Sequence, residues 1–238
     1  MSAPAPVLAQ SGPFFRHRSG HSCVEDNGIC PSWAWHHFDR YVGPFFEHLE
    51  LVLLSTAAGF VIASALALVA HRRRWLIAPV TQVSAILYTV PSLAAFFLLL
   101  PLTGRGRTTA VIALAAYTLL ILFRNTLAGL DGVPAEARDA GRGVGYTARQ
   151  LLWRVEVPLA VPAILAGLRV ALTTTVGLAA LAFYAGAGGL GEALASQKDF
   201  QTNVLLAGGL CVVMAAALDA LVLAAERLLT PWARRQAP

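Results

Sequence analysis

Five apolar runs, separated by short polar segments, organise this chain. They cover residues 49–70, 76–102, 108–130, 159–185 and 203–229. Each run has the roughly 20 residues that a helix needs to cross a hydrocarbon core of about 30 Å. The pattern predicts an all-α, polytopic membrane protein with about five transmembrane helices. Residues 1–48 form a separate N-terminal segment, residues 49–230 the transmembrane domain, and residues 231–238 a tail.

The second apolar run is interrupted near its middle. Pro91 and Ser92 follow Thr89-Val90, and Pro101 lies further along the same run. A proline removes a backbone donor and disfavours helix at the residue before it. A broken helix at membrane depth must be buried in protein or line a cavity. Pro91 and Ser92 are therefore predicted to mark a break that lines a pathway across the membrane. A simple proline kink is the alternative.

Basic residues indicate the orientation of the spans. His71-Arg72-Arg73-Arg74 follows the first run directly, and clusters of this kind stay in the cytoplasm. The N-terminus is therefore predicted outside, and the polar segment 131–158 and the tail with Arg234 and Arg235 inside. The net charge of +5 comes from arginines at the ends of apolar runs, not from a basic helix face. Membrane topology explains this charge, so nucleic-acid binding is not expected.

The N-terminal segment carries aromatic and cysteine residues. Trp33, Trp35 and Phe38 stand shortly before the first span, where aromatic rings favour the membrane interface, so a short interfacial helix is predicted. Cys23 and Cys30 would form a disulfide if this segment faces an oxidising exterior. Two free thiols are the alternative.

Three charged residues fall within the apolar runs. Arg169 lies in the fourth run, Asp219 in the fifth, and Arg124 near the inner end of the third. A charge at the centre of a bilayer costs about 3 kcal/mol or more, so it usually has a partner. We expect Arg169 and Asp219 to pair, either to hold one state of a gate or as a packing clamp. Arg124 would compete for Asp219 or extend to the interface.

The charged segment 131–158 predicts two short amphipathic helices. Pro134 suits the first turn of a helix, and Gly143-Val144-Gly145 ends that helix. Thr147 and Gln150 have the spacing of a capping box for a second helix, which Pro158 is expected to close. Two helices that meet at a glycine hinge suit the groove of a partner protein.

This segment resembles a cytoplasmic loop of permease subunits in bacterial ATP-binding cassette importers, which has the form EAA-x3-G-x9-I-x-LP. The pattern falls on Asp139-Ala140-Gly141, Gly145, Val155, Val157 and Pro158. In that family the loop docks on an ATPase subunit. The resemblance, together with Glu136 one turn earlier on the same helical face, implies these ATPase-coupling residues: Glu136, Asp139, Ala140, Gly141, Gly145, Val155 and Pro158.

Further segments are similar to permeases of osmoprotectant importers. They are Tyr88–Ala94, Leu100–Gly104, Phe123–Thr126, Trp153–Leu159 and Gly186–Gly191, and the resemblance extends from about Val42 to Leu229. It implies uptake of glycine betaine, choline, carnitine or a similar quaternary amine across the bacterial cytoplasmic membrane. It also implies a second permease, identical or different, two ATPase subunits that hold ATP and Mg, and an external substrate-binding protein.

Catalytic and metal-binding motifs are missing from the sequence. Lys198 is the only lysine and lies in a predicted outside loop, so no Walker lysine is present. We therefore expect a transport subunit that is not an enzyme and binds no cofactor or metal itself. A permease of the same fold for an amino acid remains an alternative, as does an ATP-independent channel or carrier.

Overall fold

The computed structural model describes residues 23–24 and 27–231, and within these ranges it contains helices and no strand. The N-terminal segment before Cys23 and the tail residues Arg234 and Arg235 lie outside the described residues. The elements are α1 (Pro31–His36), α2 (Asp39–Arg72), η1 (Arg74–Leu76), α3 (Ile77–Thr89), α4 (Ser92–Thr103), α5 (Arg107–Asp131), α6 (Ala135–Gly143), α7 (Ala148–Leu151), η2 (Leu152–Glu156), α8 (Val157–Ala179), η3 (Ala182–Ala185), α9 (Leu190–Ser196) and α10 (Gln201–Leu229).

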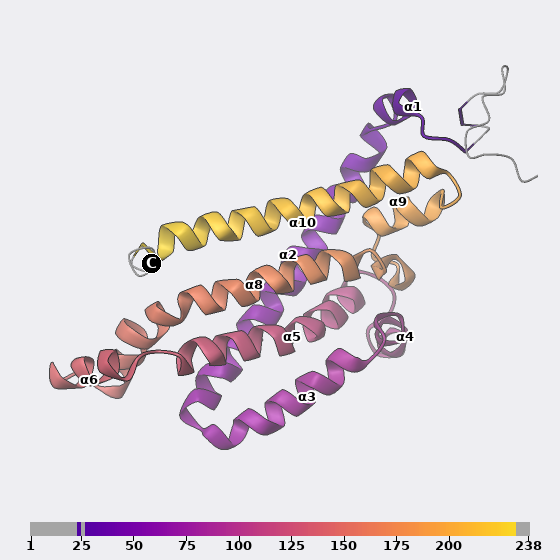
Figure 1. Cartoon of the computed structure of the whole chain (residues 1–238). Coiled ribbons are helices and arrows are strands. Elements are labelled where there is room, and N and C mark those ends of the chain that lie inside the picture. Colours follow the sequence, from indigo (N-terminus) through magenta and orange to yellow (C-terminus); the bar gives the residue numbers. More distant parts are fainter. Residues whose placement is uncertain (1–22, 25–26, 232–238) are drawn as a thin grey trace, which may run out of the picture.

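The helices pack as a bundle with α5 at its centre. In Figure 1, α5 lies between α3 and α8, α10 follows α8, and α2 crosses behind them. The buried core includes Leu51, Phe96, Leu114, Val176 and Leu190, from five different helices. Among the described residues, four helices are long and apolar enough to cross a membrane, or five if α3 and α4 form one span. The predicted all-α membrane fold is therefore confirmed.

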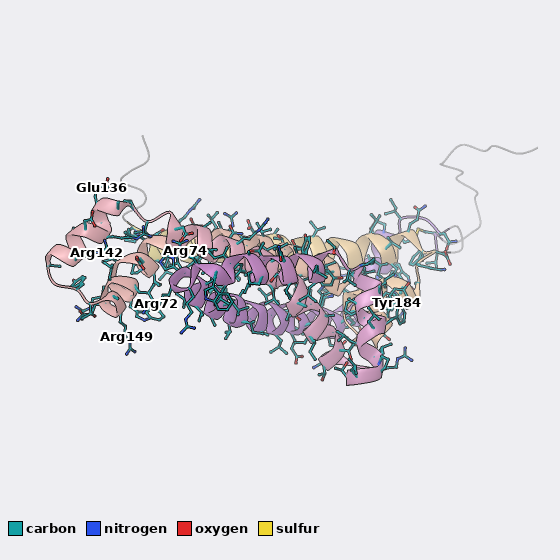
Figure 2. All side chains as sticks on the ribbon, turned by 90° about the horizontal axis from the view of Figure 1, so that it is seen from below. Arg72, Arg74, Glu136, Arg142, Arg149 and Tyr184 are labelled. Carbon is teal, nitrogen blue, oxygen red and sulfur yellow. A yellow bond between two sulfur atoms is a disulfide. The ribbon has the colours of Figure 1, made fainter. Side chains whose placement is uncertain are left out.

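The two ends of the bundle carry different elements. Figure 1 shows α6 and the end of α10 at one end, and α1 and α9 at the opposite end. Figure 2 labels Arg72 and Arg74 at the same end as Glu136, while Tyr184 lies at the other. The arginine cluster and the segment 131–158 therefore share one side, as the charge pattern predicts.

The second apolar run is sharply broken. α3 ends at Thr89, α4 begins at Ser92, and their axes meet at 100°. The hydroxyl of Tyr117 in α5 donates a hydrogen bond to the carbonyl of Val90, so this partly buried acceptor at the break is paired. The bend is too large for a simple proline kink, while its place in a transport pathway stays a prediction.

The structure corrects three predicted boundaries. α2 begins at Asp39, ten residues before the first apolar run, because helical hydrogen bonds continue through a polar and aromatic stretch. α8 ends at Ala179 and is followed by η3, so the fourth span stops short of Ala185. Pro158 does not close a second loop helix, because α7, η2 and α8 follow one another without a break from Ala148 to Ala179. η2 is a π-turn directly before Pro158, and its wider winding accommodates the proline within the continuous helix.

At the end of the bundle that carries α1 and α9, Gly191 in α9 closely approaches the end of α8. A Cβ atom on Gly191 would lie 1.9 Å from the carbonyl oxygen of Ala180 at the end of α8. Since that oxygen belongs to the backbone, it can move only if the end of α8 moves. Gly191 thus sets how closely α9 packs on the bundle.

Replacement of Gly191 by alanine should destabilise the protein by about 1–3 kcal/mol, the usual cost of overpacking. Thermal unfolding of the purified protein in detergent would show a lower midpoint. Gly208→Ala in α10 is the matched control, because a Cβ there meets no atom within 4 Å. Equal midpoints for the two variants would contradict the packing argument.

Candidate functional site

The segment between α5 and α8 forms a projecting elbow made of α6, a tight turn and α7 (Figure 1). The turn is a Schellman motif: the Tyr146 N–H donates to the Gly141 carbonyl at 3.0 Å, and the Gly145 N–H to the Arg142 carbonyl at 2.9 Å. Gly145 has a φ of +85°, which only glycine adopts without strain. The glycine therefore fixes the angle of the elbow.

A capping box begins the second arm of the elbow, as predicted. The Gln150 N–H donates to Thr147 Oγ1 at 3.3 Å, and the Thr147 N–H donates to Gln150 Oε1 at 2.9 Å. This reciprocal pair satisfies free backbone donors at the start of α7. The confirmed box places the start of the long α7–η2–α8 helix directly after the turn.

The inner face of the elbow is closely packed. Gly141 is buried, and a Cβ on it would lie 2.7 Å from Leu151 Cδ1 and 3.5 Å from Val155 Cγ2. Val155 and Pro158 are themselves partly buried. Gly141 and Val155 therefore pack where the two arms meet, and neither they nor Pro158 belong to the exposed face of α6.

The outer face of α6 is exposed. Glu136, Asp139 and Ala140 lie on it, at the i, i+3 and i+4 spacing of one helix face. Val144, at the tip, is 71% exposed and adds an apolar residue that sequence reasoning missed. Among the described residues, the one ion pair of Asp139 is with Arg142, at 3.3 Å, and both side chains are exposed. The outer face thus offers carboxylates and an apolar tip to a partner.

A charge network that the sequence did not predict joins the elbow to the bundle. Glu156 is buried in η2 and accepts a hydrogen bond from Arg138 Nε at 3.0 Å. Its other oxygen lies 3.3 Å from His71 Nε2 at the end of α2. His71 Nδ1 in turn lies 3.0 Å from Asp131, and Arg74 donates to the same carboxylate at 2.7 Å. These five side chains link α2, η1, α5, α6 and η2.

Arg138 also binds the backbone within this network. Its Nη2 donates to the carbonyl of Leu130 at 2.6 Å, one of the last carbonyls of α5, which have no partner within the helix. Movement of α6 would therefore displace the end of α5 and η2 together. Through these hydrogen bonds and ion pairs, the network joins the elbow to the ends of α2 and α5.

Arg169 and Asp219 pair across α8 and α10. Arg169 Nε donates to Asp219 Oδ1 at 2.7 Å, and Nη2 donates to Oδ2 at 2.8 Å, a bidentate geometry. Arg124 is exposed and has no ion-pair partner among the described residues; it lines a pocket between α3 and α5 with Gln82. Arg124 therefore does not compete for Asp219 in this structure.

Exchanging the charges of Arg169 and Asp219 tests whether this ion pair matters for stability and transport. Arg169→Asp or Asp219→Arg alone should reduce stability and transport, because each places two like charges side by side on α8 and α10. The double exchange should recover a substantial part of both, measured as the unfolding midpoint and the uptake rate. A double variant that is no better than either single variant would show that the pairing is unimportant.

At the opposite end, a disulfide joins Cys23 to Cys30. The loop it closes is held on α10: the Cys30 N–H donates to Thr202 Oγ1 at 2.7 Å, and Thr202 Oγ1 donates to the Gly28 carbonyl at 2.8 Å. No group of His, Cys, Asp and Glu within residues 23–24 and 27–231 has the arrangement of a metal site.

Comparisons with known proteins agree that this chain is similar to membrane components of transport systems. Residues 56–235 match a family model described as "Binding-protein-dependent transport system inner membrane component". The osmoprotectant import permease protein OsmW of Salmonella typhimurium is 39% identical over 78% of this chain and 90% of its own length. The choline transport system permease protein OpuBB of Bacillus subtilis is 34% identical, over 78% and 87%. The carnitine transport permease protein OpuCD of Listeria monocytogenes is 33% identical, over 82% and 88%.

Solved structures show the same fold. The MetNI methionine ABC transporter, in an inward-facing conformation, contains a chain with a TM-score of 0.69 at 22% identity, covering 85% of this chain and 99% of that one. An amino acid ABC transporter solved with histidines gives a TM-score of 0.67 at 17% identity, over 84% and 98%.

Proposed function

Because the chain belongs to the family of binding-protein-dependent transport system inner membrane components, we propose that it is the permease of an ATP-driven importer for glycine betaine, choline, carnitine or a similar quaternary amine. The observation that carries the solute class is the set of relatives, whose names all refer to osmoprotectants, choline or carnitine at 33–39% identity. The similarity to amino acid transporters, at 17–22% identity, concerns the fold alone.

The proposed assembly has two permease subunits, two cytoplasmic ATPase subunits and an external substrate-binding protein. The permease lies in the bacterial cytoplasmic membrane with its N-terminus outside and its C-terminus inside. ATP and Mg bind to the ATPase subunits, and this chain supplies no ATPase site of its own. The proposal is supported by the exposed outer face of α6, at the end of the bundle that carries the arginines.

The proposed mechanism is alternating access driven through the elbow. ATP shifts the balance between inward-open and outward-open states only if it binds one state better than the other. The ATPase would hold the outer face of α6, and the network of Arg138, Glu156 and His71 would pass its movement to α5 and α2. The break at Pro91 and the Arg169–Asp219 pair would change position as the spans tilt.

Reconstitution tests this function. The full complex in proteoliposomes, with ATP inside and the binding protein outside, should accumulate labelled glycine betaine, choline or carnitine but not methionine. Uptake of methionine alone would favour an amino acid permease. Uptake that is unchanged without ATP would favour a channel or carrier and contradict the proposal.

A further inference from the structure

A groove between the end of α2 and the start of the α7–η2 helix combines positive charge with an apolar wall. It has a volume of about 510 Å³. Its lining residues are Leu68, Val69, Arg72, Arg73, Arg149, Leu152 and Trp153. Three are arginines, four are apolar or aromatic, and none is a carboxylate.

The three arginines of this groove lack acidic partners within residues 27–231. Arg72 donates to the Ala148 carbonyl at 3.4 Å, and no ion pair among the described residues involves Arg73 or Arg149. Other arginines at the same end of the bundle are paired: Arg74 with Asp131, Arg138 with Glu156, and Arg142 with Asp139. The groove therefore brings together three arginines that have no acidic partner among the described residues.

The apolar wall of the groove faces outward. Val69 is 49% exposed and Trp153 is 53% exposed. Val69 lies one turn before Arg73, on the side of the apolar span, so the wall extends from the arginines toward the middle of the membrane. Trp153 has the amphipathic ring that favours the membrane interface. A matching ligand has an anionic head and apolar chains.

We propose that this groove binds an anionic phospholipid of the cytoplasmic leaflet, with its phosphate among Arg72, Arg73 and Arg149 and its acyl chains along Val69 and Trp153. Basic pockets between spans at the cytoplasmic interface have the chemistry that binds such headgroups. The inference rests on the proposed orientation of the chain in the membrane and does not depend on the transported solute.

The groove is separate from the outer face of α6. Figure 2 shows Arg149 and Arg72 along one edge of this end of the molecule and Glu136 along the other. A lipid in the groove would connect the end of α2, through Arg72 and Arg73, to the first turn of α7, through Arg149. It would thereby stabilise the attachment of the elbow to the first span.

Native mass spectrometry of the full-length chain in detergent tests this site, with phosphatidylglycerol and phosphatidylcholine as probes. Wild-type protein should bind phosphatidylglycerol more tightly than phosphatidylcholine. An arginine near an anionic headgroup contributes a factor of about five, so the triple variant Arg72→Gln, Arg73→Gln, Arg149→Gln should bind it on the order of a hundredfold more weakly. Arg142→Gln, which removes a charge from the same end but outside the groove, should leave binding unchanged.

Several results would overturn the inference. They are equal binding of the two lipids, equal binding by wild type and the triple variant, or an equal loss in Arg142→Gln. If glycerol phosphate displaces the lipid at equal concentration, the groove binds the phosphate alone and the acyl chains contribute nothing. Weaker retention of the ATPase by the triple variant, with lipid binding intact, would show that the groove contacts a protein instead.

If the triple variant does not fold, the single variants Arg73→Gln and Arg149→Gln replace it. Each should bind phosphatidylglycerol about fivefold more weakly than wild type.

Discussion

The double variant Asp139→Lys, Val144→Asp should lose ATP-driven uptake almost completely while its fold and thermal stability stay close to wild type. Both side chains are exposed on the outer face and tip of α6, so their loss removes little packing. If they contact the ATPase, a reversed charge and a charge on the apolar tip should weaken docking by about 2 kcal/mol or more, or roughly thirtyfold. Retention of the ATPase on the purified permease measures docking directly.

Arg149→Gln is the control for this prediction, because Arg149 is an exposed residue of the same elbow that lies on the opposite edge (Figure 2). It should retain the ATPase as wild type does. If the double variant keeps both its ATPase and its uptake, the outer face of α6 is not the coupling surface.

Replacing Glu156 with glutamine should separate ATP hydrolysis from uptake. The Glu156 side chain is 10% exposed and bridges Arg138 and His71, so the neutral amide leaves Arg138 without its counter-charge. Leaving a partly buried charged donor without its charged acceptor costs about 1–3 kcal/mol. Movement of the elbow would then no longer displace α2 and α5. More ATP should therefore be hydrolysed for each molecule imported. The ratio of ATP hydrolysed to solute imported is the measurement.

Asp139→Asn provides the matched control for stability. The Asp139–Arg142 pair is 70% and 65% exposed, and exposed pairs contribute about 1 kcal/mol at most. Its unfolding midpoint should change far less than that of Glu156→Gln. Wild-type coupling and an unchanged midpoint in Glu156→Gln would show that the network does not transmit movement.

The sequence predicted those parts of the fold that depend on local patterns. The apolar runs, the interruption near Pro91 and the capping box of Thr147 each follow from a few neighbouring residues. The boundaries at Asp39 and Ala179 were missed because a helix can extend beyond its apolar stretch or stop within it. Pro158 was misjudged because a π-turn before it accommodates the ring, and nothing in the local sequence indicates such a turn.

The candidate site was predicted less completely than the fold. The family pattern located the elbow, but it did not distinguish Gly141, which is buried against Leu151, from Asp139, which is exposed. The Glu156–His71 contact joins residues 85 positions apart, so only the tertiary structure brings them together. Val144 lacks any pattern of its own, and its exposure at the tip follows from the turn at Gly145.

Labelling of a single cysteine at Val144 tests the central claim, that the elbow lies in the cytoplasm and is held by the ATPase. The experiment uses Val144→Cys in a Cys211→Ser background, with the Cys23–Cys30 disulfide intact, and a membrane-impermeant maleimide. The reagent should label inverted vesicles stripped of the ATPase but not intact cells, and added ATPase should protect the site. Labelling in intact cells, or no protection by the ATPase, would contradict this account.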